Sequence, residues 1–286
     1  MGTGKIGVIG GSGLYAMAAL DNVREVEVST PFGAPSDAYI VGTLHGREMV
    51  FLPRHGRGHR FPPSAINFRA NIYGLKALGV EWVIAVSAVG SMQEAIHPGH
   101  LVVPEQFIDR THQRVSTFFT DVTVHITFAD PVCPMMARAL HQAALAAGST
   151  VHFGGTYLCI EGPQFSTRAE SQLYRQWGVD IIGMTNLPEA RLAREAELCY
   201  ATLALATDYD CWHSSAADVD IGSILAILQR NVQLAQEVIT RTVPQLQGLR
   251  TCPCSTALQN AIITDQATLS AAVRERLGLL IDRYLT

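Results

Sequence analysis

Lysine is nearly absent from this chain, and its scarcity excludes several kinds of chemistry. Only Lys5 and Lys76 are lysines, whereas the remaining basic residues are arginines. An enzyme that forms a Schiff base would have almost no lysine to use. The GxxxxGK[ST] loop, in which a lysine contacts nucleotide phosphates, is absent as well. The sequence therefore argues against a P-loop NTPase and against amine-based covalent catalysis.

Charge of either sign is also scarce. Charged residues make up 16% of the 286 residues and the net charge is −4, so the basic surface that nucleic-acid binding usually requires is not expected. No apolar run approaches the length of a membrane span, and the first residues read as a strand rather than as a secretion signal. We therefore expect a cytoplasmic protein that binds neither nucleic acid nor a membrane.

Cysteine is infrequent, and its spacing does not match a zinc motif. The most conspicuous pair lies in the stretch TCPCS, which is a candidate for disulfide formation or redox chemistry. In a cytoplasmic protein the default expectation is buried, reduced thiols, and we expect no metal in the functional site. The six cysteines are Cys133, Cys159, Cys199, Cys211, Cys252 and Cys254.

Hydrophobic residues make up 48% of the chain, which is enough for one large core. Strand-like runs alternate with helical periodicity, and several strands are apolar throughout, as in a sheet covered on both faces. We therefore expect a single α/β domain over residues 1–286, with a C-terminal helical segment at about 245–286. The expected strands are 5–10, 24–30, 38–44, 48–54, 82–89, 100–108, 156–162, 180–185 and 198–208, and the expected helices are about 65–78, 134–147, 168–177, 188–196, 219–243 and 266–284.

A glycine-rich loop follows the first strand in KIGVIGGSGL, residues 5–14. Gly11, Gly13 and Ala16 fit the dinucleotide fingerprint G-x-G-x-x-A. A Rossmann unit, however, needs a full helix after the glycines and an acidic residue roughly 20 residues further on. Only LYAMAALDN separates the loop from the next strand, so the first acids come too early. A turn whose backbone N–H groups and Ser12 hydroxyl bind a smaller anion fits better.

Two further strand ends carry groups that suit an anion. The stretch LPRHGRGHR supplies Arg54 and His55, and a guanidinium can bind phosphate oxygens bidentately. The stretch AVSAVGSM supplies Ser87 and the backbone of Ala88 at the end of another strand, where α/β proteins place their ligands. We expect these loops to converge on one anion.

Six segments occur in order over most of the chain: GVIGGSGL, PRHGRGH, SAVGSM, IEGPQFSTRAES, GMTNLPEA and ATDYDCW. Together they resemble the methylthioadenosine phosphorylases of the nucleoside phosphorylase superfamily, and the similarity becomes weak after about residue 245. The resemblance implies a central mixed, partly barrel-like β-sheet flanked by helices. It also implies phosphorolysis of 5′-methylthioadenosine to adenine and 5-methylthioribose 1-phosphate, with inorganic phosphate as co-substrate and no cofactor. Similar enzymes bind phosphate through positions that correspond to Ser12, Arg54, His55, Ser87 and Ala88.

The same resemblance makes the acids of ATDYDCW the catalytic residues. Asp208 should protonate N7 of the departing adenine, and burial would raise its pKa into the working range. Asp210 should lie behind it and orient the 6-amino group. Carboxylates accept hydrogen bonds from a 6-amino group, whereas a 6-oxopurine would prefer an amide donor. The pair of acids therefore favours adenine.

The remaining contacts to the substrate are also implied by the resemblance. Phe165 should stack on the purine beside Ser166, and Met184 should lie along the ribose beside Thr185. Gly183 departs from the asparagine of the adenine-specific enzymes, which weakens the polar contact expected there. Ile221 and Ile224 are candidates for the methylthio pocket, although such residues also pack in cores.

His125 resembles a family position that reaches the site of a neighbouring subunit, so the resemblance implies a homotrimer. Related thermophilic enzymes carry disulfides, and by this likeness Cys133 and Cys199 would be the long-range pair. Other functions remain open. Adenosine, 5′-deoxyadenosine, methylthioinosine or a 6-oxopurine nucleoside is an alternative substrate; a nicotinamide-dependent oxidoreductase and a non-catalytic nucleoside-binding protein are alternatives of other classes.

Overall fold

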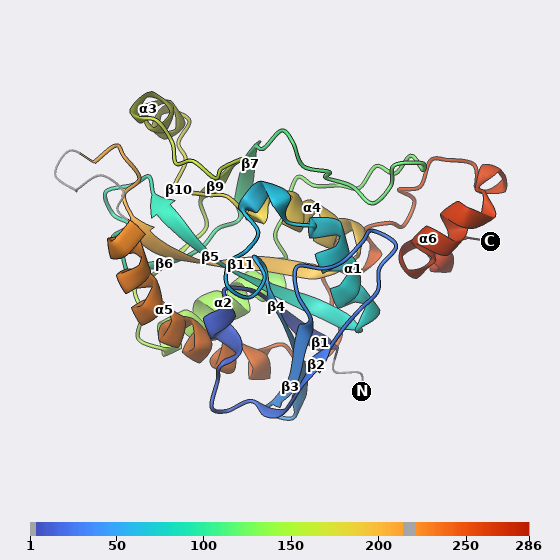
Figure 1. Ribbon diagram of the computed structural model, residues 1–286, viewed down its shortest axis with the longest axis horizontal. Coiled ribbons are helices and arrows are strands. Elements are labelled where there is room, and N and C mark those ends of the chain that lie inside the picture. The colour runs from blue at the N-terminus through green and yellow to red at the C-terminus, as the bar shows by residue number, and fades with distance from the viewer. Residues whose placement is uncertain (1–3, 214–220, 286) are drawn as a thin grey trace.

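The computed structural model describes residues 4–213 and 221–285, and the side chains of these residues except those of 12, 15 and 221–230. Eleven strands form one mixed sheet, and helices cover both of its faces (Figure 1). Among the described residues, no helix is both long and apolar enough to cross a membrane.

The strands run in the order β2-β3-β4-β1-β5-β10-β9-β7, and the sheet branches at β5, where β11, β6 and β8 continue it. Their bounds are β1 (Lys5–Gly10), β2 (Asp21–Val26), β3 (Tyr39–Leu44), β4 (Arg47–Pro53), β5 (Val80–Ser91), β6 (Leu101–Val103), β7 (Gln106–Arg110), β8 (Val151–Phe153), β9 (Thr156–Ile160), β10 (Ile181–Gly183) and β11 (Cys199–Asp208).

Strand β5 organises the sheet. It pairs in parallel with β1 and β11, and β1 pairs in parallel with β4. The carboxyl ends of these four strands therefore meet at one edge, which is where open α/β sheets bind ligands. The last residues of β5 also pair with the antiparallel strand β10, so the segment that follows β10 reaches the same edge.

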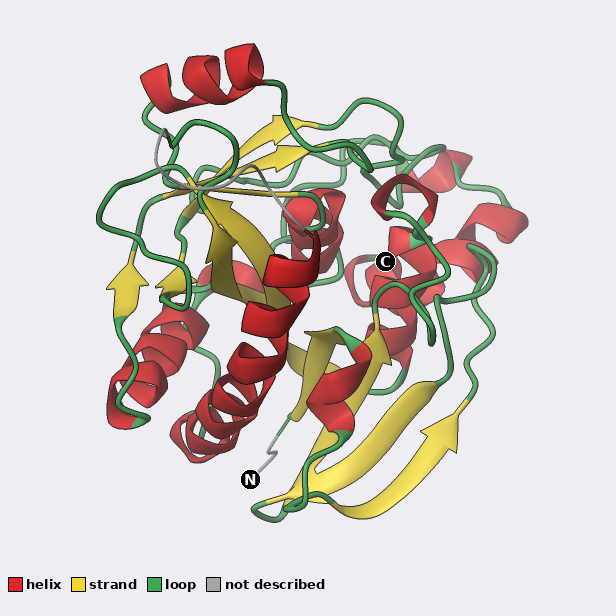
Figure 2. Ribbon diagram, turned by 60° about the vertical axis from the view of Figure 1, so that its left-hand side comes forward, coloured by secondary structure: helices red, strands yellow, loops and turns green. Residues whose placement is uncertain are grey.

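The helices form two layers (Figure 2). Helices α1 (Phe68–Ala77), α4 (Asn186–Glu195) and α6 (Ala271–Ile281) contribute to the core on one face, and α2 (Pro134–Ala146) and α5 (Ile221–Thr242) pack on the other. Helix α3 (Arg168–Gln176) stands at the rim (Figure 1). Short 3-10 turns are η1 (Ser12–Tyr15), η2 (Pro63–Ala65), η3 (Val243–Gln245), η4 (Pro253–Thr256), η5 (Gln266–Thr268) and η6 (Asp282–Tyr284).

The apolar strands supply both cores through the two-residue repeat of the pleat. In β5, Val83 and Ala85 face the core beneath α1 and α4, whereas Trp82, Ile84 and Val86 face the core beneath α2 and α5. Strand β11 alternates in the same way. A strand that is buried on both faces has no polar alternation, which is why the sequence shows continuous hydrophobic runs here.

The expected α/β class with a mixed sheet and flanking helices is confirmed, but the sheet does not close, so the barrel-like element of the expectation is wrong. The expected strand 100–108 is split into β6 and β7, because Pro104 between them has no N–H for a ladder. Strand β8 was not expected. The C-terminal segment contains α6, whose Leu277, Leu280 and Ile281 join the core.

Gly74 in α1 gives a test of this packing. A Cβ atom there would lie 2.1 Å from the phenolic oxygen of Tyr39, whose hydroxyl donates to the carbonyl of Asn71 at 2.9 Å. Alanine normally favours a helix over glycine by about 1 kcal/mol. We nevertheless expect Gly74→Ala to lower the free energy of unfolding by about 1–3 kcal/mol, because a close-packed core cannot absorb the added methyl.

The matched control is Gly278→Ala in α6. Its Cβ would meet only the end of the Asp282 side chain, which can rotate away. Urea unfolding should show no loss of stability for this control. Equal effects of the two substitutions would contradict the packing assigned to Gly74.

Candidate active site

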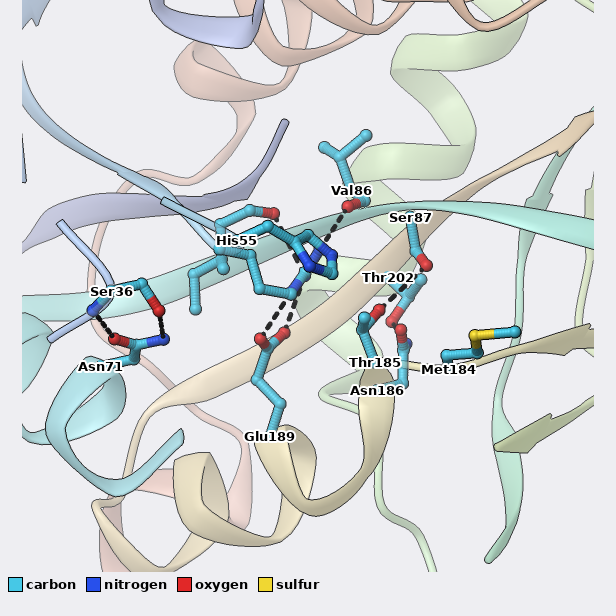
Figure 3. Close-up of polar contacts among 12 residues, drawn as sticks. Ser36, His55, Asn71, Val86, Ser87, Met184, Thr185, Asn186, Glu189 and Thr202 are labelled. Carbon is cyan, nitrogen blue, oxygen red and sulfur yellow. Dashed lines mark hydrogen bonds and ion pairs between the residues drawn. The ribbon is translucent and has the colours of Figure 1, made fainter. Parts of the chain in front are cut away.

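Arg54 anchors the edge where the parallel strands end. It follows β4, and its backbone N–H donates to the carbonyl of Gly10 at the end of β1 at 2.9 Å. Its side chain is buried and forms a two-pronged ion pair with Glu189 of α4, from Nε at 2.8 Å and from Nη2 at 2.9 Å (Figure 3). Tyr200 donates its hydroxyl to the same carboxylate at 2.9 Å.

The charge of this guanidinium is largely compensated. Burial alone would lower the pKa of Arg54, but the carboxylate of Glu189 raises it above its usual value. The carbonyls of Val86 and Ile9 accept from Nη1 and Nη2 at 2.8 and 3.3 Å. Of the five N–H groups, one on Nη1 therefore has no hydrogen-bond partner among the described residues.

Three hydroxyl groups lie together beside this ion pair. Ser87 Oγ of β5 is 3.1 Å from Thr185 Oγ1 and 3.4 Å from the phenolic oxygen of Tyr157. Ser87 and Thr185 are buried, whereas Ala88 is exposed in the middle of an otherwise buried strand. The strand thus opens to solvent at the position where hydroxyl groups and a backbone amide could receive an anion. Thr185, expected beside the ribose, lies with Ser87.

One ring nitrogen of His55 is engaged in a hydrogen bond within the protein. Its Nδ1 donates to the carbonyl of Phe61 at 2.8 Å, and its ring stacks on His59 with centroids 4.1 Å apart. Burial, opposed by the hydrogen bond to Phe61, lowers the pKa of His55 to about 4. The ring is therefore neutral at pH 7, and Nε2 carries a lone pair that can only accept a hydrogen bond. Figure 3 draws His55 together with Ser87 of β5 and Glu189 of α4.

The glycine-rich loop leads from β1 into η1, which has only four residues and is followed by the antiparallel edge strand β2. The long helix of a dinucleotide-binding unit does not follow, which agrees with the preference for a smaller anion. A Cβ at Gly11 would meet no atom within 4 Å, so its backbone lies open. The side chain of Ser12 lies outside the described residues.

A bulge near the end of β11 sets the direction of Asp208. Ala206 pairs with Val89 and Asp208 with Gly90, so Thr207 is an extra residue. The bulge turns the carboxyl of Asp208 toward the side of β5 that carries Ala88. Gly90 leaves the necessary room, since a Cβ there would lie 2.9 Å from Asp208 Oδ1.

The two acids keep an elevated proton affinity. Burial raises the pKa of Asp208, against hydrogen bonds at 2.7 Å from the Thr207 hydroxyl and from the amide of Asp210. Burial also raises the pKa of Asp210. Asp210 adopts a φ of 52°, an uncommon conformation for aspartate, which the tight turn after the strand imposes. An acid held in this way is suited to proton transfer.

Met184 lies against the loop that follows β9. A Cβ at Gly162 would approach its sulfur to 2.5 Å. Arg114 joins the two loops: it donates to the carbonyls of Met184 at 2.6 Å and of Glu161 at 2.6 Å. The glycine at 183 has a steric cause, because a Cβ there would lie 2.0 Å from the Tyr157 phenolic oxygen. Asparagine at this position would require Tyr157 to move.

The segment expected to contact a purine is accessible. Phe165 is 48% exposed and therefore presents its ring to solvent. The Ser166 hydroxyl is buried without a partner among the described residues, and the Ser166 carbonyl accepts from Cys211 Sγ at 3.3 Å. Helix α5 begins at Ile221, but the side chains of Ile221 and Ile224 lie outside the described residues.

His125 lies away from these residues. It is exposed, and its backbone N–H donates to the carbonyl of Ala261 at 2.9 Å. It borders a cavity of about 520 Å³ between residues 116–128 and the end of α4, where Arg191 and Glu195 line it. This cavity is separate from the edge that carries Arg54 and Asp208.

Several residues that shape the site were missed from the sequence. Glu189 binds Arg54, and Tyr200 donates to Glu189. Tyr157 lies with the hydroxyls of Ser87 and Thr185, and Arg114 donates to the carbonyl of Met184. The sequence offered one indication of these residues, the glutamate of the largely uncharged segment GMTNLPEA, which needs a partner if it is buried. Within the described ranges, the only group of three or more clustered metal-ligating side chains is a set of four cysteines elsewhere in the fold.

Comparisons with known proteins place this arrangement in a family. The sequence profile of the phosphorylase superfamily matches residues 5–244. An S-methyl-5′-thioadenosine phosphorylase of Geobacter sulfurreducens is 60% identical, over 98% of this chain and 99% of its own length. A solved methylthioadenosine phosphorylase from an antarctic soil metagenomic library aligns with a TM-score of 0.92 at 50% identity, over 96% of this chain and 98% of that one. The Schistosoma mansoni methylthioadenosine phosphorylase in complex with adenine aligns with a TM-score of 0.82 at 34% identity, over 97% and 98%.

The buried state of His55 predicts a pH dependence of stability. Its pKa is about 4 in the folded chain and about 6.5 when unfolded, so the unfolded state binds more protons between these values. Its contribution is therefore present above pH 6.5 and is lost as the pH falls toward 4. Asparagine at position 55 keeps a donor for the Phe61 carbonyl but does not titrate. Between pH 7 and pH 5 we therefore expect the free energy of unfolding of His55→Asn to fall less than that of the wild type. If urea unfolding shows the same loss of stability with falling pH for the variant and the wild type, His55 is not neutral in the folded chain.

Proposed function

This chain belongs to the phosphorylase superfamily, and on that premise we propose that it cleaves the N-glycosidic bond of 5′-methylthioadenosine with inorganic phosphate. The products are adenine and 5-methylthioribose 1-phosphate. The proposal is carried by two kinds of group near the carboxyl ends of paired strands. Hydroxyl and N–H donors for an anion lie beside Ser87 of β5, and the half-buried acid Asp208 ends β11. The names of the full-length relatives support it. No cofactor enters the scheme.

Phosphate would bind among Ser87, Thr185, the amide of Ala88 and the free N–H of Arg54, with Ser12 on the glycine-rich loop. Held beneath C1′ of the ribose, it attacks without the entropic cost of a bimolecular encounter. A neutral His55 with Nδ1 occupied offers only an acceptor. It would therefore accept the O–H of hydrogen phosphate and leave the unprotonated oxygens to face the sugar.

The ribose would pass through a cationic, oxocarbenium-like state, which the phosphate oxygens stabilise. Adenine leaves more easily with a proton at N7, and Asp208 supplies or shares that proton. The Thr207 hydroxyl and the Asp210 amide each bind one oxygen of Asp208 at 2.7 Å and so fix the direction of its carboxyl group. Asp210 would help to orient the 6-amino group.

Recognition of the nucleoside would come from the surrounding loops. Phe165 would stack on the purine. The Ser166 hydroxyl, which has no partner within the described residues, would contact a polar edge of the base. Met184 would lie along the ribose, and Ile221 and Ile224 would border the methylthio group. A carboxylate facing the 6-amino group favours adenine nucleosides over 6-oxopurine nucleosides.

The decisive experiment is to incubate the protein with 5′-methylthioadenosine, with and without phosphate, and to measure free adenine. Adenine should appear only with phosphate, and phosphorus NMR should detect a sugar 1-phosphate. Adenosine, 5′-deoxyadenosine and methylthioinosine in parallel identify the preferred nucleoside. Release of adenine without phosphate, or no release at all, would refute the proposal.

A homotrimer follows from the same proposal, with His125 completing the site of a neighbouring subunit. His125 is exposed and lies apart from the other site residues of its own chain. Light scattering should give a mass three times the 31.0 kDa of the chain. An active monomer at assay concentration would contradict the shared site. The cytoplasmic location stays a prediction.

Replacement of the acid is the sharpest test of the mechanism. Asp208→Asn keeps the shape of the side chain but cannot transfer a proton, so turnover of 5′-methylthioadenosine should fall by roughly two to four orders of magnitude. Relative activity should shift toward 6-oxopurine nucleosides, because an amide N–H now faces O6. The exposed Asp21→Asn on β2 is the matched control and should leave turnover unchanged. Near wild-type turnover of Asp208→Asn would place the acid elsewhere, with Asp210 as the next candidate.

A further inference from the structure

Four of the six cysteines meet at one point in the core beneath α2 and α5. The sulfur atoms of Cys133, Cys199, Cys252 and Cys254, here called the cysteine cluster, all lie within 4.8 Å of one another. All four residues are buried, and none forms a disulfide. The mechanism above uses none of them, and the spacing along the sequence gave no indication of a metal motif.

The cluster joins three distant parts of the chain. Cys133 precedes the first residue of α2, and its N–H donates to the carbonyl of Tyr200 at 2.8 Å. Cys199 is the first residue of β11, and Cys252 and Cys254 flank Pro253 at the start of η4. The phosphorylase superfamily profile ends at residue 244, so two of the cysteines lie within the matched region and two lie beyond it.

The geometry fits a single tetrahedral ion. With Zn–S bonds of about 2.3 Å, the sulfurs of a tetrahedral site lie about 3.8 Å apart. The limit of 4.8 Å for the whole cluster includes this separation, and Cys199 Sγ and Cys252 Sγ are 3.3 Å apart. That distance is well beyond a disulfide bond of about 2.05 Å. Four thiolate sulfurs in a tetrahedron are the ligand set that zinc prefers.

The surroundings of the cluster also bear on its occupant. The four cysteines belong to the same apolar core as Met136 and Leu246. Four thiolates could not remain ionised in such a core without a cation, because burying an unpaired charge is costly. A bound Zn²⁺ compensates part of that charge and replaces the four thiol protons, which pass to solvent. Metal affinity should therefore rise with pH.

We propose that the cysteine cluster binds one Zn²⁺ as a structural tetrathiolate site. The ion ties the segment after α5 to the start of β11 and to the N-terminal end of α2. Strand β11 ends at Asp208, so the ion stabilises the strand that carries the acid without touching substrate. Zinc neither gains nor loses electrons here, and the site requires no oxidant.

The test measures metal directly. The full chain is produced in zinc-supplemented medium and purified without a histidine tag under reducing conditions. Elemental mass spectrometry should then find about one zinc per chain. The Cys252→Ser/Cys254→Ser variant should lose the zinc and melt at a lower temperature. Cys159→Ser is the matched control, because Cys159 is buried but lies outside the cluster, and its zinc content should be unchanged.

Two further measurements keep the proposal open to refutation if the double variant does not fold. Wild-type protein stripped of zinc and loaded with Co²⁺ should show the strong visible absorption of a tetrahedral cobalt thiolate. Non-reducing mass spectrometry should find the four cysteines without disulfides. Less than about a tenth of an equivalent of zinc after reconstitution, iron in its place, or two disulfides within the cluster would each overturn the proposal.

Discussion

The ion pair between Arg54 and Glu189 is the contact on which the strand-end site depends. Through one guanidinium it joins the ends of β1 and β4, the middle of β5 and the start of α4. Loss of either partner would leave a buried, uncompensated charge at a cost of about 3–5 kcal/mol. The pair also fixes the helix that follows Thr185. Arg54, which the sequence predicts to bind phosphate, therefore has a structural role, and one of its N–H groups has no partner within the described part of the chain.

Glycines determine how closely the functional loops approach one another. At Gly90 and Gly162 an added Cβ would reach Asp208 and Met184, and at Gly183 it would reach Tyr157. In each case a polar or polarisable group from another element occupies the space that a side chain at the glycine would need. The positions of Asp208, Met184 and Tyr157 therefore depend on glycines in other elements.

Local patterns were sufficient for the α/β class, for nearly all strands and helices, and for the strand ends that carry Arg54, Ser87 and Asp208. Features that depend on partners far along the chain were not predictable. Glu189 lies 135 residues from Arg54, and the cysteine cluster joins segments from Cys133 to Cys254. Strand β8 has three residues, too few for a recognisable period, and the side chain of Ser12 lies outside the described residues.

The bulge at Thr207 makes chain length, as well as residue type, a determinant of the site. If β11 continued its two-residue repeat without the bulge, Asp208 would lie on the face of Ala206, away from Ala88. Point substitutions along this strand can be absorbed by repacking, whereas a single-residue insertion or deletion within its regularly paired part, Cys199–Ala206, would move the acid to the other side of the sheet. The side of the sheet on which the acid lies therefore depends on the length of this strand more strongly than on its individual residues.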